Sequence, residues 1–399
     1  MKKVLILGAS RYYSRCIEAT RKSGYYVIAV DKNPEAEGFA YANKSFACDI
    51  VDKELVLSIS QEAEIDAIIP LNDYGVTTAA YVSQVMSLPG ISLITAELAT
   101  NKERMRLKWL ADGLPCPNVF VAHSIKEIYE GVKIIGFPCI LKPAHGCGGA
   151  SRGVVVVKAQ KELRSAIEFS TKFYDDKTTL VETFIESERE HSAEVLVFNG
   201  ECYVLAIADK IKTKLPYRVD KNVIYPTTLP ILKQKELVNT IKESIASLGI
   251  NIGAVHIELA TTRNGPILFE LGARCGGGGT PEPIVPFVTG VSMFVELVRI
   301  LAGDLPETLT PFLQRACNYH FLTPEKGKIL TVSGLNRIKK NSCVLDFEMF
   351  KNAGDEIGEV QIGTDRSGFI IVGANSPSKA IELGYTLEKE IKIQYTQLP

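Results

Sequence analysis

Short apolar runs and amphipathic stretches alternate along the first hundred residues. The apolar runs cover residues 4–7, 27–30 and 67–70, which is the length of a buried strand. Residues 16–23 and 73–86 place their apolar positions at helical spacing. Strands that alternate with helices in this way predict a parallel sheet with helices packed on its faces.

The pattern changes near residue 114. We expect one helix, capped by Thr95 and carrying Lys102, to end at Asp112-Gly113, because the Leu-Pro-Cys-Pro sequence of residues 114–117 then breaks the chain. From residue 318 onward short strands predominate, and a last helix is expected to begin at Ser376-Pro377. Between these regions the sequence predicts strands at residues 139–141, 154–157 and 179–181, helices at 163–171, 234–248 and 291–301, and a hairpin of residues 192–198 and 202–208.

Two glutamates end two successive apolar runs, Glu258 in GAVHIELA and Glu270 in PILFELGARCGGGG. The TTRNGP sequence between the runs is typical of a tight turn, so two antiparallel strands would bring both carboxylates to the same end of a sheet. Paired carboxylate oxygens beside a glycine-rich loop and Arg274 suit Mg²⁺ that carries nucleotide phosphates. The alternative is a pair of strand-end carboxylates that only face solvent.

A candidate phosphate-binding element lies upstream, in CILKPAHGCGGASRGVVVV. An apolar strand ends at Lys142, a run of small residues that includes Gly148 and Gly149 follows, and Ser151 leads toward another strand. Glycines let backbone N–H groups converge on phosphate oxygens, and Lys142 supplies a cation. The spacing is not that of a P-loop, and a purely structural hairpin loop is the alternative.

A third segment is TTLVETFIESEREHSAEVLV, in which a strand runs into Glu182, Phe184 and Ile185 and then into a charged turn. The backbone and apolar side chains of Phe184 and Ile185 would form one wall of an adenine pocket. Glu190 would accept hydrogen bonds from ribose hydroxyls. Charged turns are usually only solvated, so this segment is informative only together with the other two.

Composition and charge argue against several classes of protein. The 399 residues suffice for two or three domains, and a formal net charge of −1 without a long basic stretch gives little support for binding nucleic acid or a membrane surface. No apolar run reaches the ~18–20 residues of a membrane helix, and the start MKKVLILGAS is not typical of a signal peptide. Nine cysteines without a CxxC pair favour reduced thiols in a cytoplasmic protein.

An NAD-binding function is disfavoured by the turn after the first predicted strand. Its sequence, GASRYYS, lacks the second and third glycines that let a dinucleotide pyrophosphate approach the backbone.

The three segments and Lys102 occur in the order and spacing of ATP-grasp enzymes, and the whole chain resembles that family. The resemblance implies an α/β and α+β fold: a Rossmann-like pre-grasp domain at residues 1–97, an ATP-grasp domain at 98–312 with a lid at about 115–182, and a small C-terminal domain at 313–399. In this family ATP lies between two antiparallel sheets. Its γ-phosphate activates a substrate carboxylate as an acyl phosphate, which an amine or another nucleophile then attacks.

The resemblance also implies a role for each site residue. Arg274 would face the transferred phosphate and the acyl group, with Lys142 as a further catalytic cation. Glu258 and Glu270 would hold Mg²⁺, which we expect as two ions. ATP would be bound by Lys102, Lys142, Gly148, Gly149, Ser151, Glu182, Phe184, Ile185, Glu190 and, as the apolar floor under the base, Leu268.

One position departs from the family pattern. Many members have Glu-x-Asn-x-Arg, in which the asparagine is a third metal ligand, whereas this chain has Gly272. We expect Mg²⁺ binding to survive, since this ion commonly retains waters. The E-x-x-x-R pattern with following glycines is similar to the amino-acid and peptide ligase branch. His256 shares the strand face of Glu258, and we expect a structural histidine there.

These observations predict an ATP-dependent ligase that joins a small, amino-acid-like carboxylate to an amine and releases ADP and phosphate. Small molecules are the expected partners, with no nucleic acid and no membrane, and a homodimer is possible. One alternative is an ATP-grasp ligase of purine or carbamoyl-phosphate metabolism. The other is a regulatory protein that binds ATP without turnover.

Overall fold

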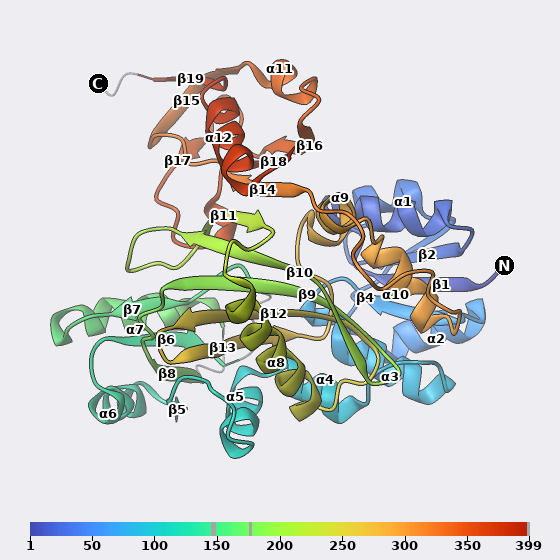
Figure 1. The fold of residues 1–399 in the computed structure, drawn as a ribbon, viewed down its shortest axis with the longest axis horizontal. Coiled ribbons are helices and arrows are strands. Elements are labelled where there is room, and N and C mark those ends of the chain that lie inside the picture. The colour runs from blue at the N-terminus through green and yellow to red at the C-terminus, as the bar shows by residue number, and fades with distance from the viewer. Residues whose placement is uncertain (145–148, 175–177, 397–399) are drawn as a thin grey trace.

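The computed structural model describes residues 1–144, 149–174 and 178–396. The amino-terminal region forms a four-stranded sheet of order β3-β2-β1-β4, in which every neighbouring pair is parallel (Figure 1). The parallel sheet predicted for this region is therefore confirmed. Its elements are β1 (Lys3–Leu7), α1 (Ser14–Lys22), β2 (Tyr26–Asp31), β3 (Lys44–Ala47), α2 (Lys53–Ala63), β4 (Ala67–Pro70) and α3 (Asp73–Met86).

The single helix predicted after Thr95 is wrong, because two helices occupy this stretch: α4 (Leu93–Thr100) and α5 (Lys102–Ala111). Ser92, not Thr95, caps the first helix, and its side chain accepts a hydrogen bond from the Thr95 backbone N–H. Asn101 adopts an extended conformation and caps α5 through the Arg104 N–H at 3.0 Å. The break makes Lys102 the first residue of α5.

The predicted lid contains a small sheet of its own, of order β5-β8-β6-β7. All its neighbouring strands are antiparallel, and an apolar core that includes Leu141, Val157 and Val181 fills one side of it. Its elements are β5 (Val119–Ala122), α6 (Ile125–Ile135), β6 (Cys139–Pro143), β7 (Val155–Val157), α7 (Leu163–Ser170) and β8 (Thr179–Thr183).

An eight-stranded sheet of order β13-β12-β9-β10-β11-β14-β18-β16 runs through the middle of the molecule. It crosses residue 312, where the sequence predicts a domain boundary, because β11 pairs with β14 through four register partners. The predicted C-terminal domain thus shares a continuous sheet with the ATP-grasp region. The strands are β9 (Arg189–Phe198), β10 (Glu201–Lys212), β11 (Asp220–Tyr225), β12 (Gly253–Thr262), β13 (Gly265–Gly272), β14 (Ala316–Phe321), β16 (Val344–Met349) and β18 (Gly368–Ala374).

Helices cover this sheet and join it to the amino-terminal region. In α10 (Met293–Leu301), Phe294 and Leu297 share one buried cluster with Val4 of β1, Ile69 of β4 and Leu196 of β9. The helix therefore packs between the two sheets. Further helices are α8 (Ile231–Ser247), α9 (Val285–Thr289) and α12 (Pro377–Glu388), the last capped by Ser376 as predicted.

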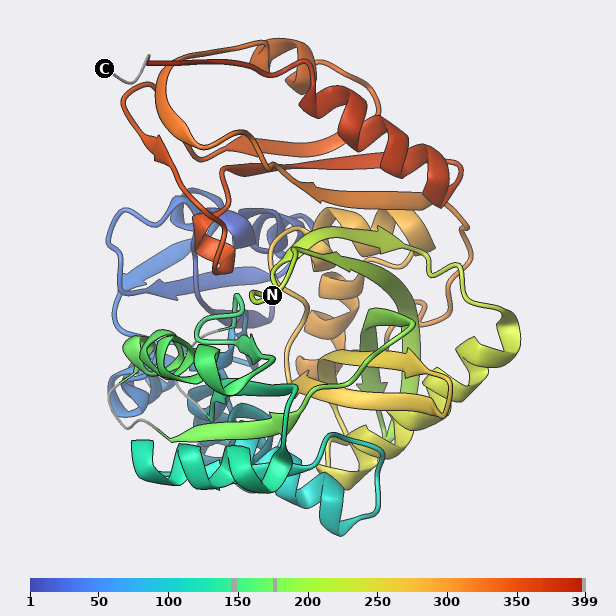
Figure 2. The ribbon, with the colours of Figure 1, turned by 90° about the vertical axis from the view of Figure 1, so that its left-hand side faces the viewer.

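A third small sheet, of order β17-β15-β19, closes the carboxy-terminal end. Figure 2 shows these red and orange strands above the blue amino-terminal sheet and the green lid. Its elements are β15 (Gly327–Ser333), α11 (Leu335–Lys339), β17 (Glu356–Ile357) and β19 (Lys392–Tyr395).

Within the described residues no single helix is long and apolar enough to cross a membrane. One pair, Thr280–Thr289 and Met293–Leu301, passes by length and composition together, but it is bent by 110°. The eight cysteines in the described part of the chain are free thiols.

Candidate functional site

Glu258 and Glu270 are direct register partners across the β12–β13 hairpin. Residues directly opposite each other in antiparallel strands point to the same face of the sheet. The turn between the strands consists of Arg263 and Asn264, as the Asn-Gly-Pro sequence predicts. The side chains of the two glutamates keep 32% and 34% exposure, so both carboxylates remain reachable from solvent. The predicted pairing of the two glutamates is therefore confirmed.

Lysines from two other elements surround this pair. Lys102, at the start of α5, places its Nζ 2.8 Å from Glu270, and Lys210 of β10 places its Nζ 2.6 Å from Glu258. Burial disfavours the charged form of Glu258, but Lys210 and Lys212 outweigh it and hold its pKa well below the ordinary range. Both lysines of β10 also contact Asp220, at 3.1 and 2.7 Å.

The oxygen donors on this face fit Mg²⁺ bound to a nucleotide. Glu258 and Glu270 offer hard carboxylate oxygens side by side. Among residues 1–144, 149–174 and 178–396, no cluster of three or more acidic, histidine or cysteine side chains could hold a metal alone. An ion held by two carboxylates would therefore complete its coordination with phosphate oxygens and water, which is how Mg²⁺ is commonly bound.

Lys142 and Glu182 form part of a buried ion network with Arg106, which the sequence analysis missed. Glu182 is 2% exposed and binds the Nε of Arg106 and the Nζ of Lys142, each at 2.9 Å. Burial raises the pKa of Glu182, but the two cations outweigh this effect and leave it lowered. Arg106 further donates to the carbonyls of Leu268 and Phe269, at 3.0 and 2.7 Å. The network fastens the lid strand β8 to α5 and β13.

The predicted adenine hinge follows directly on β8. The backbone N–H of Phe184 donates to the Pro138 carbonyl at 3.3 Å, so it is committed within the lid. The Ile185 backbone makes no hydrogen bond to any other described residue. Of the two hinge N–H groups, that of Ile185 is therefore the one open to a ligand.

The structure does not support the assignment of Leu268 as the floor under the base. Leu268 is 0% exposed and belongs to an apolar core cluster together with Leu259, its register partner. The register of β13 shifts next to Glu270, so that Phe269 is the extra residue of a bulge and is partly exposed. A period-two reading of the sequence could not reveal this shift.

Glu190, the expected ribose ligand, lies on β9 within a charged group. Lys212 approaches it at 3.6 Å, and Arg218 forms a close ion pair with it. The Arg218 carbonyl in turn accepts a hydrogen bond from the Ser151 hydroxyl at 3.1 Å. Gly149 has a positive φ of 72°, which a glycine adopts readily. Gly148, His145 and Cys147 lie outside the described residues.

Arg274 is fixed by Asp73, the first residue of α3. Its Nε and Nη2 donate to the two carboxylate oxygens of Asp73, each at 2.8 Å, and its Nη1 donates to the Cys275 carbonyl at 2.9 Å. Burial raises the pKa of Asp73, but Arg274 outweighs it and lowers the value below the ordinary range. The guanidinium has five N–H groups, so two remain for a substrate.

Models of three known protein families match successive parts of this chain. The model of an ATP-grasp domain matches residues 135–282, that of a PylC-like N-terminal domain matches 4–94, and L-amino acid ligase C-terminal domain 2 matches 320–396. Residues 135–282 of this chain therefore form an ATP-grasp domain. The predicted ATP-grasp fold and its placement near the amino-acid ligases are confirmed by these matches.

A solved structure has the same fold as this protein over the whole length of both chains. The crystal structure of L-amino acid ligase from Bacillus licheniformis superimposes with a TM-score of 0.85 at 22% identity, and covers 100% of this chain and 99% of that one. An L-arginine-specific L-amino acid ligase of Bacillus subtilis is 22% identical over 319 residues, or 78% of this chain and 76% of the relative.

A longer ATP-grasp relative is matched in part only. The carbamoyl phosphate synthase large chain of Pseudothermotoga lettingae is 25% identical over 288 residues. The alignment takes 68% of this chain but spans only 24% of that relative.

The departure of this ATP-grasp chain at Gly272 has a steric reason. A Cβ at position 272 would lie 3.1 Å from the Asp73 Oδ1 and 3.3 Å from the Arg274 Cζ. Such separations are shorter than ordinary van der Waals contact, so an asparagine at this position would crowd the ion pair between Arg274 and Asp73. Gly272 thus accommodates a contact that fixes Arg274.

His256 has the structural surroundings that we expect from the sequence. Its Nδ1 lies 2.6 Å from Glu194, which is 0% exposed, and its Nε2 lies 3.7 Å from Glu258. Burial lowers the pKa of His256, but Glu194 outweighs it and raises the value to about 9. Glu194 also accepts the Gly276 N–H at 3.0 Å, so this pair anchors the glycine loop that follows Arg274.

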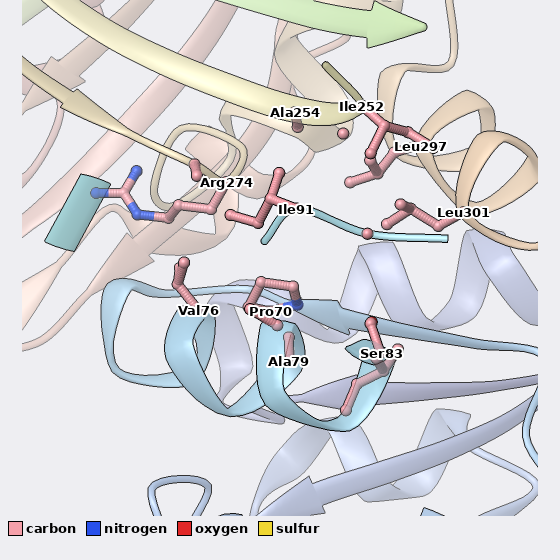
Figure 3. Close-up of a pocket in the computed structure, with 15 residues that line it drawn as sticks. Pro70, Val76, Ala79, Ser83, Ile91, Ile252, Ala254, Arg274, Leu297 and Leu301 are labelled. Atoms are coloured by element: carbon pink, nitrogen blue, oxygen red, sulfur yellow. The ribbon is translucent and has the colours of Figure 1, made fainter. Parts of the chain in front are cut away.

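A cavity of about 40 Å³ lies behind Arg274, between α3 and α10 (Figure 3). Val76, Ala79, Ile91 and Leu297 contribute to its largely apolar lining. A largely apolar space of this size suits neither the phosphates nor the length of a nucleotide. The carboxylate face of β12 and β13 remains the candidate nucleotide site.

A buried acid gives the stability of this protein a specific pH dependence. Burial raises the pKa of Glu282 to about 7, with Arg15 opposing. Because the fold favours the neutral acid, this stabilising contribution is present below about pH 4.5 and is lost as the pH rises through about 7. Glu282→Gln should therefore be more stable than the wild type at pH 8, by roughly 1–3 kcal/mol, and similar to it at pH 4.5.

Urea unfolding of both proteins at the two pH values measures this difference. Glu236→Gln, at an exposed position of α8, is the matched control. An equal stability difference between Glu282→Gln and the wild type at pH 4.5 and pH 8 would contradict the prediction.

Proposed function

We propose that this protein is an ATP-dependent ligase that activates a small, amino-acid-like carboxylate as an acyl phosphate and joins it to an amine. The observation that carries the proposal is the direct pairing of Glu258 with Glu270 on one sheet face, between Lys102 and Lys210. Paired oxygen ligands flanked by cations suit the transfer of a phosphoryl group, where charge must be neutralised at several oxygens.

The base of ATP would lie against the hinge. The Ile185 N–H would donate to the N1 of adenine, since the Phe184 N–H is already used by Pro138. Lys142 would face the phosphates from the end of β6, held in place by Glu182. Glu190 would accept hydrogen bonds from the ribose hydroxyls, while Lys212 and Arg218 fix the orientation of its carboxylate.

Glu258 and Glu270 would hold the Mg²⁺, which supplies Lewis-acid stabilisation of phosphate charge when bound. Around them, the lysines provide fixed positive charge that needs no rearrangement during the reaction. Such preorganised charge is worth more at a partly buried site than in water. Arg274, fixed by Asp73, directs its two remaining N–H groups toward the substrate side.

The reaction proceeds in two balanced steps. A carboxylate oxygen of the first substrate attacks the γ-phosphorus, a P–O bond breaks, and ADP leaves. The amine nitrogen of the second substrate then attacks the acyl carbon, the C–O bond breaks, and phosphate leaves. One proton of the amine is lost to the surroundings. Arg274 would hold oxygens of the phosphoryl and acyl groups through both steps.

Amino-acid-like substrates are supported by the L-amino acid ligase C-terminal model and by the two amino-acid ligases. We extend the proposal to a cytoplasmic enzyme with small-molecule partners. The proposal also includes a homodimer. Sedimentation of the purified protein measures its oligomeric state and tests this part.

The function is tested by substrate-dependent release of ADP from MgATP, with pooled amino acids and other carboxylates as first substrates. We expect ADP release only when a carboxylate and an amine are both present, together with a new amide product. Release that instead requires an amino sugar phosphate or bicarbonate would favour the purine or carbamoyl-phosphate alternative. Tight ATP binding without release under any pool would favour a regulatory protein.

The hinge predicts a preference for ATP over GTP. Guanine carries a hydrogen on N1, so the Ile185 N–H would meet a donor instead of an acceptor. Loss of one such hydrogen bond, with a buried donor left unpaired, lowers kcat/KM by roughly tenfold or more. Turnover with both nucleotides at saturating second substrate measures the ratio. Equal kcat/KM values would refute the hinge assignment.

A further inference from the structure

A turn between β17 and β18 reaches from the carboxy-terminal region to the glycine loop of the lid. The turn is built on Asp365, whose carboxylate accepts the N–H groups of Gln361 and Ile362 at 3.0 and 2.9 Å. At its tip the Gly363 N–H donates to the Ala150 carbonyl at 2.7 Å. A Cβ on Gly363 would lie 2.9 Å from the Ala150 Cβ, so a glycine permits this approach.

Arg366 follows this turn and has unused hydrogen-bonding capacity. Its Nη2 donates to the Asp220 carbonyl at 2.8 Å, and its guanidinium carbon lies 3.5 Å from the ring centroid of Phe321. Its Nε is buried and has no hydrogen-bond partner among the described residues. Buried donors are normally paired, so an unpaired one next to a candidate site suggests a ligand.

A chain of contacts joins Arg366 to the metal-binding face. Its Nη2 donates to the backbone of Asp220, whose carboxylate lies 3.1 Å from Lys210, and Lys210 in turn lies 2.6 Å from Glu258. Burial lowers the pKa of Arg366, and this effect is opposed by the charge of Asp220 and, to a smaller extent, by Tyr319, Tyr12 and Glu258. An arginine nevertheless stays protonated in proteins. The Tyr319 hydroxyl lies 2.5 Å from where a Cβ of Gly278 would be, on the glycine loop after Arg274. Arg366 is therefore connected to the Glu258 face through Asp220 and Lys210. The strand on whose Phe321 ring it stacks, β14, reaches the glycine loop through Tyr319.

We propose that Arg366 is a second arginine of the active site, which together with Arg274 binds an oxyanion, namely the phosphoryl group being transferred. The proposal rests on the proposed function for its role in the reaction. Within the described part of the chain, Arg274 already commits three N–H groups to Asp73 and Cys275, whereas Arg366 commits one. A guanidinium fork holds two phosphate oxygens at once, which a lysine cannot do.

Inorganic phosphate is the probe, because it represents the transferred group and its binding requires no turnover. Titration calorimetry measures its affinity for the protein saturated with MgADP. We expect Arg366→Met to weaken phosphate binding by tenfold or more and to change the MgADP affinity by less than twofold. Arg337→Met, at an exposed position of α11, should leave both affinities unchanged.

A second variant covers the case in which Arg366→Met does not fold. Arg366→Gln removes the charge but keeps a polar side chain with N–H donors, so a loss of phosphate binding in this variant would reflect the missing guanidinium. A merely structural arginine would alter the unfolding temperature of these variants without altering phosphate affinity. Unchanged phosphate affinity in the folded variants, or no phosphate binding by the wild type with MgADP, would overturn the proposal.

The outcome is distinguishable from that of the proposed function. One outcome is that no pool of carboxylates and amines supports ADP release while phosphate binding still depends on Arg366. That outcome would support the oxyanion site and refute the ligase reaction. If ligation occurred and phosphate affinity did not depend on Arg366, the ligase reaction would be supported and the oxyanion site at Arg366 would be refuted.

Discussion

Glu270→Gln is expected to lower ligase turnover by about 10²–10³-fold, the usual effect of removing one charge-stabilising group from an active site. The substitution keeps the length and shape of the side chain but removes the charge that Mg²⁺ requires. It also removes the charged group that Lys102 contacts at 2.8 Å. Nucleotide affinity should fall much less, because the hinge and the remaining cations still hold the base and the phosphates.

The measurement is steady-state ADP release, combined with equilibrium binding of MgADP. Glu201→Gln, at an exposed position of β10, provides a matched change of charge on the same sheet. Wild-type turnover in Glu270→Gln, or activity that survives a chelator of divalent ions, would show that the two glutamates do not bind the metal.

Arg274→Lys is expected to lower ligation by roughly 10²-fold or more while ATP binds almost normally. Charge builds on the γ-phosphate oxygens as the carboxylate attacks, so a fixed bidentate cation there acts mainly on the transition state. Lysine keeps the positive charge but cannot bind the two Asp73 oxygens and a substrate group at once. The reduction should therefore appear in kcat more than in the apparent affinity for ATP.

Asp73→Asn serves as the companion variant, because it leaves Arg274 in place and removes the carboxylate that orients it. We expect an intermediate loss of kcat from Asp73→Asn. If both variants changed the unfolding temperature but left kcat within twofold of the wild type, Arg274 would only join the amino-terminal region to β13.

The sequence was sufficient to predict the parts of the site that are local. The β12–β13 hairpin is short, its turn is two residues long, and both glutamates lie in strands adjacent along the chain. Their pairing therefore follows from strand periodicity and turn chemistry. The same holds for the strand that carries Lys142 and for the cap of α12 at Ser376.

Contacts between distant segments could not be predicted in this way. Asp73 and Arg274 are separated by 201 positions, and Arg106 and Glu182 by 76. No local pattern links such pairs, because their distance depends on how whole sheets and helices pack. Charged residues that follow the apolar run of a strand, such as Lys210 in β10, are the signal that could have been followed.

Two local errors also have a physical explanation. Leu268 was assigned to the nucleotide face by family position, but the bulge in the hairpin directs it to the core. Thr95 resembles a cap residue, yet the preceding Ser92 already accepts its N–H. In the first case a one-residue bulge decides which side chain faces the nucleotide site. In the second case a shift of three residues decides which side chain caps the helix.

The central claim is that a substrate carboxylate is phosphorylated before the amine attacks. With a carboxylate substrate labelled with ¹⁸O at both oxygens, the proposed mechanism transfers one labelled oxygen to phosphate for each amide formed. Mass spectrometry of the released phosphate measures this transfer. We expect one ¹⁸O atom per phosphate during productive ligation, whereas unlabelled phosphate under the same conditions would contradict the acyl-phosphate mechanism.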